Sequence, residues 1–197
     1  MQKIKIIEKI NIVLLILSII LCLVYLIFTF SKKPVEVKKV DNITTKFNYV
    51  TYDRDTEIFK KEFENLKTIL DETHINYEDY ANSLSKLFII DLYTLTNKKI
   101  NQDVGGIQFI EKTFKDNFVL NVSNNMYKYI KQLKNLPEVK EVFVTKTEKV
   151  KYKYQNKEYD AYSVELKWEY KEDYEYEKEG TLFLIKDSEQ LFIVEKK

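Results

Sequence analysis

From Tyr162 to Tyr170 the chain reads YSVELKWEY, in which apolar or aromatic residues alternate strictly with polar ones. This period of two is typical of a β-strand that buries one face. Shorter stretches with the same period surround it, at Val142–Val144, Tyr152–Tyr154, Leu182–Leu184 and Leu191–Ile193. Three polar triplets that read as turns divide these stretches into four groups, at Gln155–Lys157, Lys171–Asp173 and Asp187–Glu189. The sequence therefore predicts a four-stranded antiparallel meander with one face packed and the other partly wet.

Before residue 139 the apolar residues recur every three or four positions, which is the spacing of amphipathic helices. The first such stripe runs from Asp55 to Leu70, and the second from Tyr77 to Leu95. A third runs from Phe118 to Leu133 and stops ahead of Pro137. The predicted fold class is therefore α+β, with about three helices packed on a curled four-stranded antiparallel sheet.

The N-terminal part holds an uncharged run, IVLLILSIILCLVYLIFTF, from Ile12 to Phe30. Its length matches a hydrocarbon core of about 30 Å, so it predicts one transmembrane helix. A cleaved signal peptide would need a shorter apolar stretch and a small-residue cleavage site, which do not occur before Ser31. The predicted organisation is a tail over residues 1–11, the span over 12–30, a linker over 31–53 and an α+β domain over 54–197.

The distribution of lysines does not decide on which side of the membrane the domain lies, because lysines flank the span at both ends. The prediction therefore depends on the lengths of the segments before and after the span. A short N-terminal tail before a long domain is the usual layout of a signal-anchor protein. We therefore expect a single-pass protein of the cell membrane with an extracytoplasmic domain. The abundance of Lys, Asn, Ile and Tyr is typical of an AT-rich genome and favours a bacterial source.

Composition excludes several function classes. The chain has 32 basic and 31 acidic residues, so no field that would attract nucleic acid is expected. Cys22 is the single cysteine and lies in the apolar run, which excludes internal disulfides and cysteine metal clusters. His74 is the single histidine, and its spacing supplies no partner ligands. We predict no catalytic residue, no metal and no cofactor.

The order of elements, from the stripe at Asp55 to the end of the meander, resembles the nuclear-transport-factor-like cone domains of single-pass scaffold proteins in conjugation-type secretion machinery. The resemblance lies in architecture behind one membrane span, not in any motif. It implies a non-enzymatic assembly or binding role, with another envelope protein or a second copy of the chain as partner. No functional residue carries over, because fold alone does not specify function.

The segment from Asp103 to Phe109 is a candidate interaction loop, with Asp103, Gly105, Gly106, Gln108 and Phe109 as its key residues. Two of the three glycines in the chain stand side by side here. Adjacent glycines admit positive φ or a close backbone approach. We expect a rigid loop with an exposed Ile107–Phe109 stretch, and the alternative is a turn that only connects helices.

Asp91 lies within the apolar stripe of the second predicted helix, where a carboxylate should be paired or hydrogen-bonded. It is expected to make an internal structural bond. A functional alternative is a polar group in a pocket with Tyr93 and Trp168, which predicts a small-molecule-binding or hydrolytic cone-shaped domain. The sequence favours the membrane-anchored scaffold over this alternative.

Overall fold

The computed structural model describes residues 14–15, 17–22, 38–44 and 46–197. Residues Lys38–Lys197 form one compact unit, and the chain before Lys38 belongs to another. In the latter, residues 14–15 and 17–22 are helical and exposed. No helix within these described ranges is long and apolar enough to cross a membrane. The predicted span from Ile12 to Phe30 lies for the most part outside the described residues.

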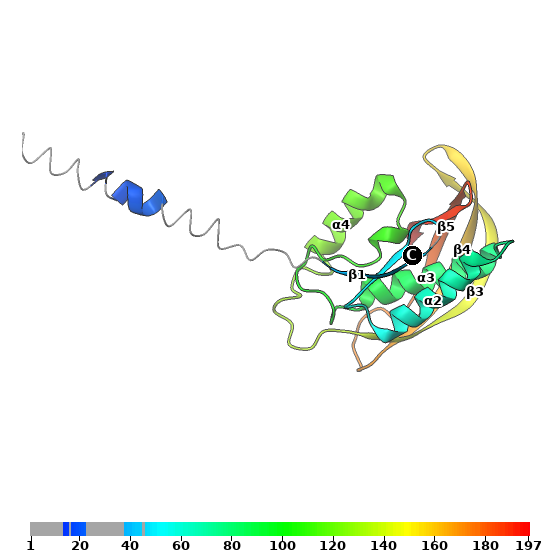
Figure 1. The fold of residues 1–197 in the computed structure, drawn as a ribbon, viewed down its shortest axis with the longest axis horizontal. Helices are drawn as coiled ribbons and strands as arrows, with labels where there is room; N and C mark the ends of the chain where they lie inside the picture. Colours follow the sequence, from blue (N-terminus) through cyan, green and yellow to red (C-terminus); the bar gives the residue numbers. More distant parts are fainter. Residues whose placement is uncertain (1–13, 16, 23–37, 45) are drawn as a thin grey trace, which may run out of the picture. The chain divides into compact units, whose positions relative to one another are not determined.

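The predicted meander is confirmed as a four-stranded antiparallel sheet in the order β3-β4-β5-β6 (Figure 1). Its strands are β3 (Val139–Tyr154), β4 (Lys157–Tyr170), β5 (Glu179–Asp187) and β6 (Gln190–Lys196). The alternation in β4 divides the faces as expected, because Val164, Leu166 and Trp168 are buried whereas Glu165 and Lys167 are exposed. The sheet therefore has one face in the core and one face in water.

The sheet is not curled, which corrects the sequence-based expectation. Strong curvature needs repeated bulges or glycine bends. Gly180 is the single glycine within the described strands, and the register shifts only at isolated points such as Val144/Lys146 and Phe183/Leu184. The long β3–β4 pair consequently forms an open sheet whose edges are β3 and β6.

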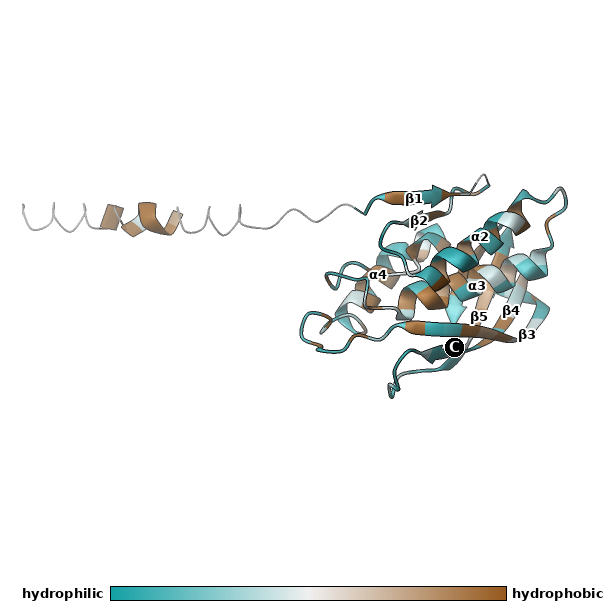
Figure 2. Cartoon of the chain, turned by 60° about the horizontal axis from the view of Figure 1, so that its bottom comes forward, coloured by the Kyte–Doolittle hydropathy of each residue, from teal (hydrophilic) through white to brown (hydrophobic). Residues whose placement is uncertain are grey.

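Two of the three predicted helices are confirmed, as α2 (Glu57–Asp71) and α3 (Tyr77–Tyr93). The side chain of Asn76 caps α3 by accepting a hydrogen bond from Glu78 N. Most of α3 is buried around its whole circumference, because it lies between α2 and the sheet (Figure 1). The polar side of α2 faces away from α3, as its teal residues in Figure 2 show.

The second half of the predicted linker is folded, which corrects the boundary at residue 53. A hairpin of β1 (Val40–Ile43) and β2 (Val50–Tyr52) occupies it. Phe47 and Asn48 take positive φ in its turn. Tyr49 is buried at 2% exposure, and its hydroxyl lies 2.7 Å from that of Tyr80 on α3. The hairpin is therefore part of the domain core.

The third predicted helix is shorter than expected. It begins after the 3-10 turns η1 (Ile107–Phe109) and η2 (Lys112–Phe114) and continues as α4 (Lys115–Asn124). Asn125 caps it, because both its backbone N and its side-chain amide donate to the Asn121 carbonyl, and Tyr127 N then donates to Val122 O. Residues 125–132 then follow as turns rather than α-helix.

Candidate functional site

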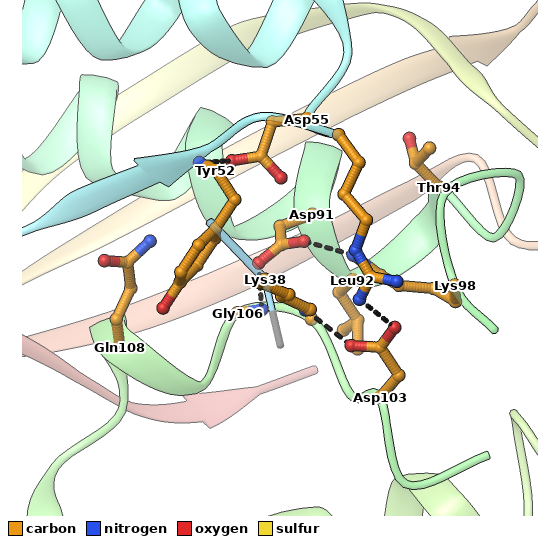
Figure 3. A network of polar contacts seen from close by, with 12 residues as sticks. Lys38, Tyr52, Asp55, Asp91, Leu92, Thr94, Lys98, Asp103, Gly106 and Gln108 are labelled. Atoms are coloured by element: carbon orange, nitrogen blue, oxygen red, sulfur yellow. Dashed lines mark hydrogen bonds and ion pairs between the residues drawn. The ribbon is translucent and has the colours of Figure 1, made fainter. Parts of the chain in front are cut away.

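Asp91 is the centre of a polar network between α3 and the following loop (Figure 3). One carboxylate oxygen pairs with Lys98, and the other accepts a hydrogen bond from Gly106 N at 2.7 Å. The Lys98 side chain is only 1% exposed, so this is a largely buried ion pair. The expected internal bonding of Asp91 is confirmed, and the sequence did not identify Lys98 as its partner.

The paired glycines allow this loop to approach α3 closely. A Cβ atom on Gly105 would lie 2.0 Å from the Asp91 carbonyl oxygen. Gly106 has φ +77°, and a Cβ there would lie 2.6 Å from the Phe88 ring. Both positions therefore require glycine for reasons internal to the domain.

The expected exposure of Ile107–Phe109 is wrong. Phe109 is fully buried, and its ring centroid lies 5.5 Å from that of Tyr49. The Gln108 amide donates to Val50 O at 3.0 Å and accepts from Val50 N at 2.9 Å, so it binds β2 as a neighbouring strand would. The loop from Asp103 to Phe109 fixes the β1–β2 hairpin to the core, and its aromatic residue is not available to a partner.

Asp103, in the same loop, forms ion pairs with residues from the N-terminal part of the domain. Its carboxylate forms ion pairs with Lys38 and Arg54, as Figure 3 shows for Lys38. Burial alone would raise the pKa of Asp103, but the hydrogen bond and charge of Lys38, together with Arg54 and Lys98, outweigh it and lower the pKa below 3.8. The carboxylate is therefore ionised throughout the neutral range.

This lowered pKa predicts an acid-sensitive contribution to stability. A group with a depressed folded-state pKa stabilises the fold above its unfolded pKa, here 3.8, and loses that contribution as the pH falls through the folded value. Asp103→Asn should therefore lower the free energy of unfolding by about 1 to 2 kcal/mol at pH 7. Urea titrations at pH 7 and below pH 3 should show the two proteins converging in acid. The exposed, lysine-paired Asp173 gives the control, because Asp173→Asn should change little at either pH.

Tyr93 and Trp168 occupy a different environment from Asp91, which corrects the predicted pocket. Residues two apart on a helix project about 200° apart, so Asp91 and Tyr93 leave α3 on nearly opposite sides. The Tyr93 and Trp168 rings pack 4.9 Å apart, and the Tyr93 hydroxyl donates to Glu177. Burial raises the pKa of Tyr93 and the bond to Glu177 raises it further, so the phenol stays neutral.

The region around Tyr93 opens into an apolar groove. One hollow of about 450 Å³ lies between α4 and β6, with Phe88, Phe118 and Ile193 among its lining residues. A second hollow of about 330 Å³ includes Leu133 and Tyr176. Tyr93 and Met126 line both hollows, so the two adjoin. We call this pair of adjoining hollows the α4 groove.

The walls of the α4 groove leave apolar side chains in contact with water. Met126 is 37% exposed, Leu133 39% and Tyr176 46%. Tyr176 stacks on Tyr174 at 5.6 Å, and both rings adjoin Tyr170. The helical stripe predicted for residues 118–133 assigned Met126 and Leu133 to the core, so the sequence placed them in the wrong environment. The early end of α4 at Asn124 is what exposes them.

A third hollow, of about 610 Å³, is polar and lies beside α2, α3 and β3. Glu62, one of its lining residues, accepts a hydrogen bond from Ser83 at 2.7 Å and lies 3.8 Å from Lys86. No group of three or more potential metal ligands gathers anywhere in the described part of the chain.

Comparisons with protein-family models, curated proteins and solved structures find no match to this chain.

Proposed function

We propose that this chain is a membrane-anchored, non-enzymatic interaction or scaffold protein of the cell envelope. Its domain binds another envelope protein, or a second copy of itself, through the α4 groove. The observation that carries this proposal is the pair of adjoining apolar hollows at Tyr93 and Met126, whose walls remain partly exposed. Exposed apolar surface arranged in a concave site is typical of protein-binding sites.

The location rests on the uncharged run from Ile12 to Phe30, which has the length of a membrane span. The short lysine-bearing tail before it favours an extracytoplasmic domain. The order of helices followed by an antiparallel sheet supports the scaffold role by analogy of architecture only.

A small-molecule-binding or hydrolytic domain near Asp91 is the second candidate, and it has less support. Both oxygens of the Asp91 carboxylate are occupied by Lys98 and Gly106 N. Tyr93 and Trp168, the other members of that predicted pocket, pack against each other instead. A general acid or base needs a free position facing a substrate, and the network gives Asp91 a structural role.

Photocrosslinking in the intact membrane tests the groove. The full-length chain is expressed with p-benzoylphenylalanine at Met126, and in a parallel strain at Phe143. Phe143 is the matched control, because it is 42% exposed on β3 and lies outside the α4 groove. We expect a discrete adduct from position 126 and none from 143. An adduct at twice the chain mass of 23.7 kDa would identify self-association.

A blocking substitution makes the result specific to the groove. Asn121 lines the 450 Å³ hollow of the α4 groove, so Asn121→Trp should fill this hollow and remove the adduct. Asp116 is also exposed on α4 but lines neither hollow, so Asp116→Trp should leave the adduct intact. Equal crosslinking at 126 and 143, or equal effects of the two tryptophans, would exclude the groove as the binding site.

A further inference from the structure

The segment Lys112–Leu136 carries a separate feature of the domain, an excess of positive charge. It has five lysines, at 112, 115, 128, 131 and 134, against the single acidic residue Asp116. The remainder of residues 38–197 has 22 basic and 28 acidic residues. A basic surface therefore stands on an otherwise acidic domain.

These five lysines are not used to hold the domain together. None of them forms an ion pair with another side chain that the structure describes, whereas lysines on β3 do have acidic partners, such as Lys140 with Glu169 and Lys151 with Asp160. Four of the five, at 112, 128, 131 and 134, are exposed. Their charge is therefore available to an external anion.

The backbone after α4 turns two of these lysines, Lys128 and Lys131, away from the core. Ile130 N donates to Tyr127 O and Gln132 N to Tyr129 O, so the chain here turns about once every three residues. Tyr127 and Ile130 consequently both face the core, at 0% and 4% exposure. Lys128 and Lys131 share the same spacing one residue later and are both exposed, and Lys134 is exposed just after these turns end at residue 132.

Apolar side chains outside the groove accompany these lysines. Tyr129 is 51% exposed and Leu120 is 60% exposed, and neither lines a hollow of the α4 groove. The Lys128 ammonium group lies 5.1 Å from the centre of the Tyr129 ring. Lysines beside exposed tyrosine and leucine are the combination found at the interface of a bilayer, where aromatic rings lie at headgroup level.

We propose that this basic face, comprising the five lysines with Leu120 and Tyr129, docks on a bilayer surface that contains anionic phospholipid. Charge complementarity selects the occupant, because anionic headgroups attract clustered lysines. The inference rests on the membrane anchoring proposed above. Under that topology the seven residues Ser31–Val37 separate the span from Lys38, and seven extended residues reach at most about 25 Å. The domain is thereby held within reach of the lipid surface.

Fluorescence of the full-length protein in vesicles tests docking. Cys22→Ser removes the native thiol, and Tyr129→Cys carries an environment-sensitive dye. The vesicles are of phosphatidylcholine alone or of phosphatidylcholine with phosphatidylglycerol. We expect a blue shift of the emission only with phosphatidylglycerol, reversed by high salt. The same dye at Phe143→Cys on β3 should show no dependence on lipid.

Charge-matched variants identify the lysines responsible. Replacing Lys128, Lys131 and Lys134 by Gln should lower the ratio of docked to undocked domain about 100-fold, because each lysine near an anionic surface contributes about a fivefold factor. Replacing Lys149, Lys151 and Lys153 on β3 by Gln removes the same charge and should leave the shift unchanged. Equal loss in both triple variants would overturn the proposal.

Two further outcomes separate this inference from the anchor and from a protein partner. Carbonate-resistant protein without a phosphatidylglycerol-dependent shift overturns the docking face and leaves the anchor intact. Carbonate-extracted protein that still shows the shift supports the face and refutes the anchor. A shift that soluble polyglutamate induces in phosphatidylcholine vesicles, and that phosphatidylglycerol does not, would assign the face to an acidic protein and overturn the lipid assignment.

Discussion

Replacing Phe109 with alanine is expected to lower the free energy of unfolding by about 3 to 5 kcal/mol. Phe109 is fully buried and packs against Tyr49 of the β1–β2 hairpin, so truncation leaves a cavity where the hairpin meets the core. Urea unfolding of the full-length protein in detergent, followed by fluorescence, measures the effect. Trp168, the single tryptophan, is 2% exposed and reports on the core.

Phe143→Ala is the matched control, because the same side chain is removed from a position that is 42% exposed. It should cost less than about 1 kcal/mol. Gln108→Ala should fall between them, at about 1 to 2 kcal/mol, since it removes two hydrogen bonds to Val50. If Phe109 served recognition instead, its removal would leave unfolding unchanged and weaken only partner binding.

The sheet could be predicted because its signal is local. The alternation from Tyr162 to Tyr170 specifies which side chains of β4 face the core, and turn residues separate each strand from the next. At two of the predicted turns the backbone takes positive φ, at Gln155, Asn156 and Ser188. Strand period and turn chemistry agree here, so the sequence specified the element order and the buried face.

The third helix could not be bounded in the same way. Its apolar residues continue at helical spacing to Leu133, but the Asn124–Asn125 pair interrupts it. Asparagine is a weak helix former whose amide competes for backbone groups. The two asparagines indicate the end of the helix, but the apolar period taken alone predicts that the helix continues past them. The exposure of Met126 and the α4 groove both follow from this stop.

The hairpin over residues 40–52 was missed for a different reason. Its strands are only four and three residues long and show no clear alternation. Tyr49 is held by Tyr80 and Phe109, which come from α3 and η1. Contacts between residues so distant in sequence produce no local periodicity. The sequence alone therefore predicts a linker for this segment.

The polar network was also missed in part, because Lys98 lies beyond the predicted second helix and no periodic pattern marks it as the partner of Asp91. We expect Asp91→Ala to destabilise the domain by about 3 to 5 kcal/mol, since it leaves the buried Lys98 ammonium without its partner. It also removes the acceptor of Gly106 N. Lys98→Met should cost less, about 1 to 3 kcal/mol, because Asp91 keeps its bond to Gly106 and some contact with water.

The double variant Asp91→Leu with Lys98→Met decides whether the pair acts as a unit. Replacing both charges by apolar side chains removes the unpaired ammonium, so the double variant should unfold at higher urea than Asp91→Ala alone. A coupling energy of about 1 kcal/mol or more is expected from the cycle formed by Asp91→Leu, Lys98→Met and the double variant. Strictly additive costs would mean that the two groups contribute independently. A near-neutral Asp91→Ala would show that the carboxylate is not needed for folding, and would restore the ligand-binding or hydrolytic alternative, in which Asp91 is kept for chemistry.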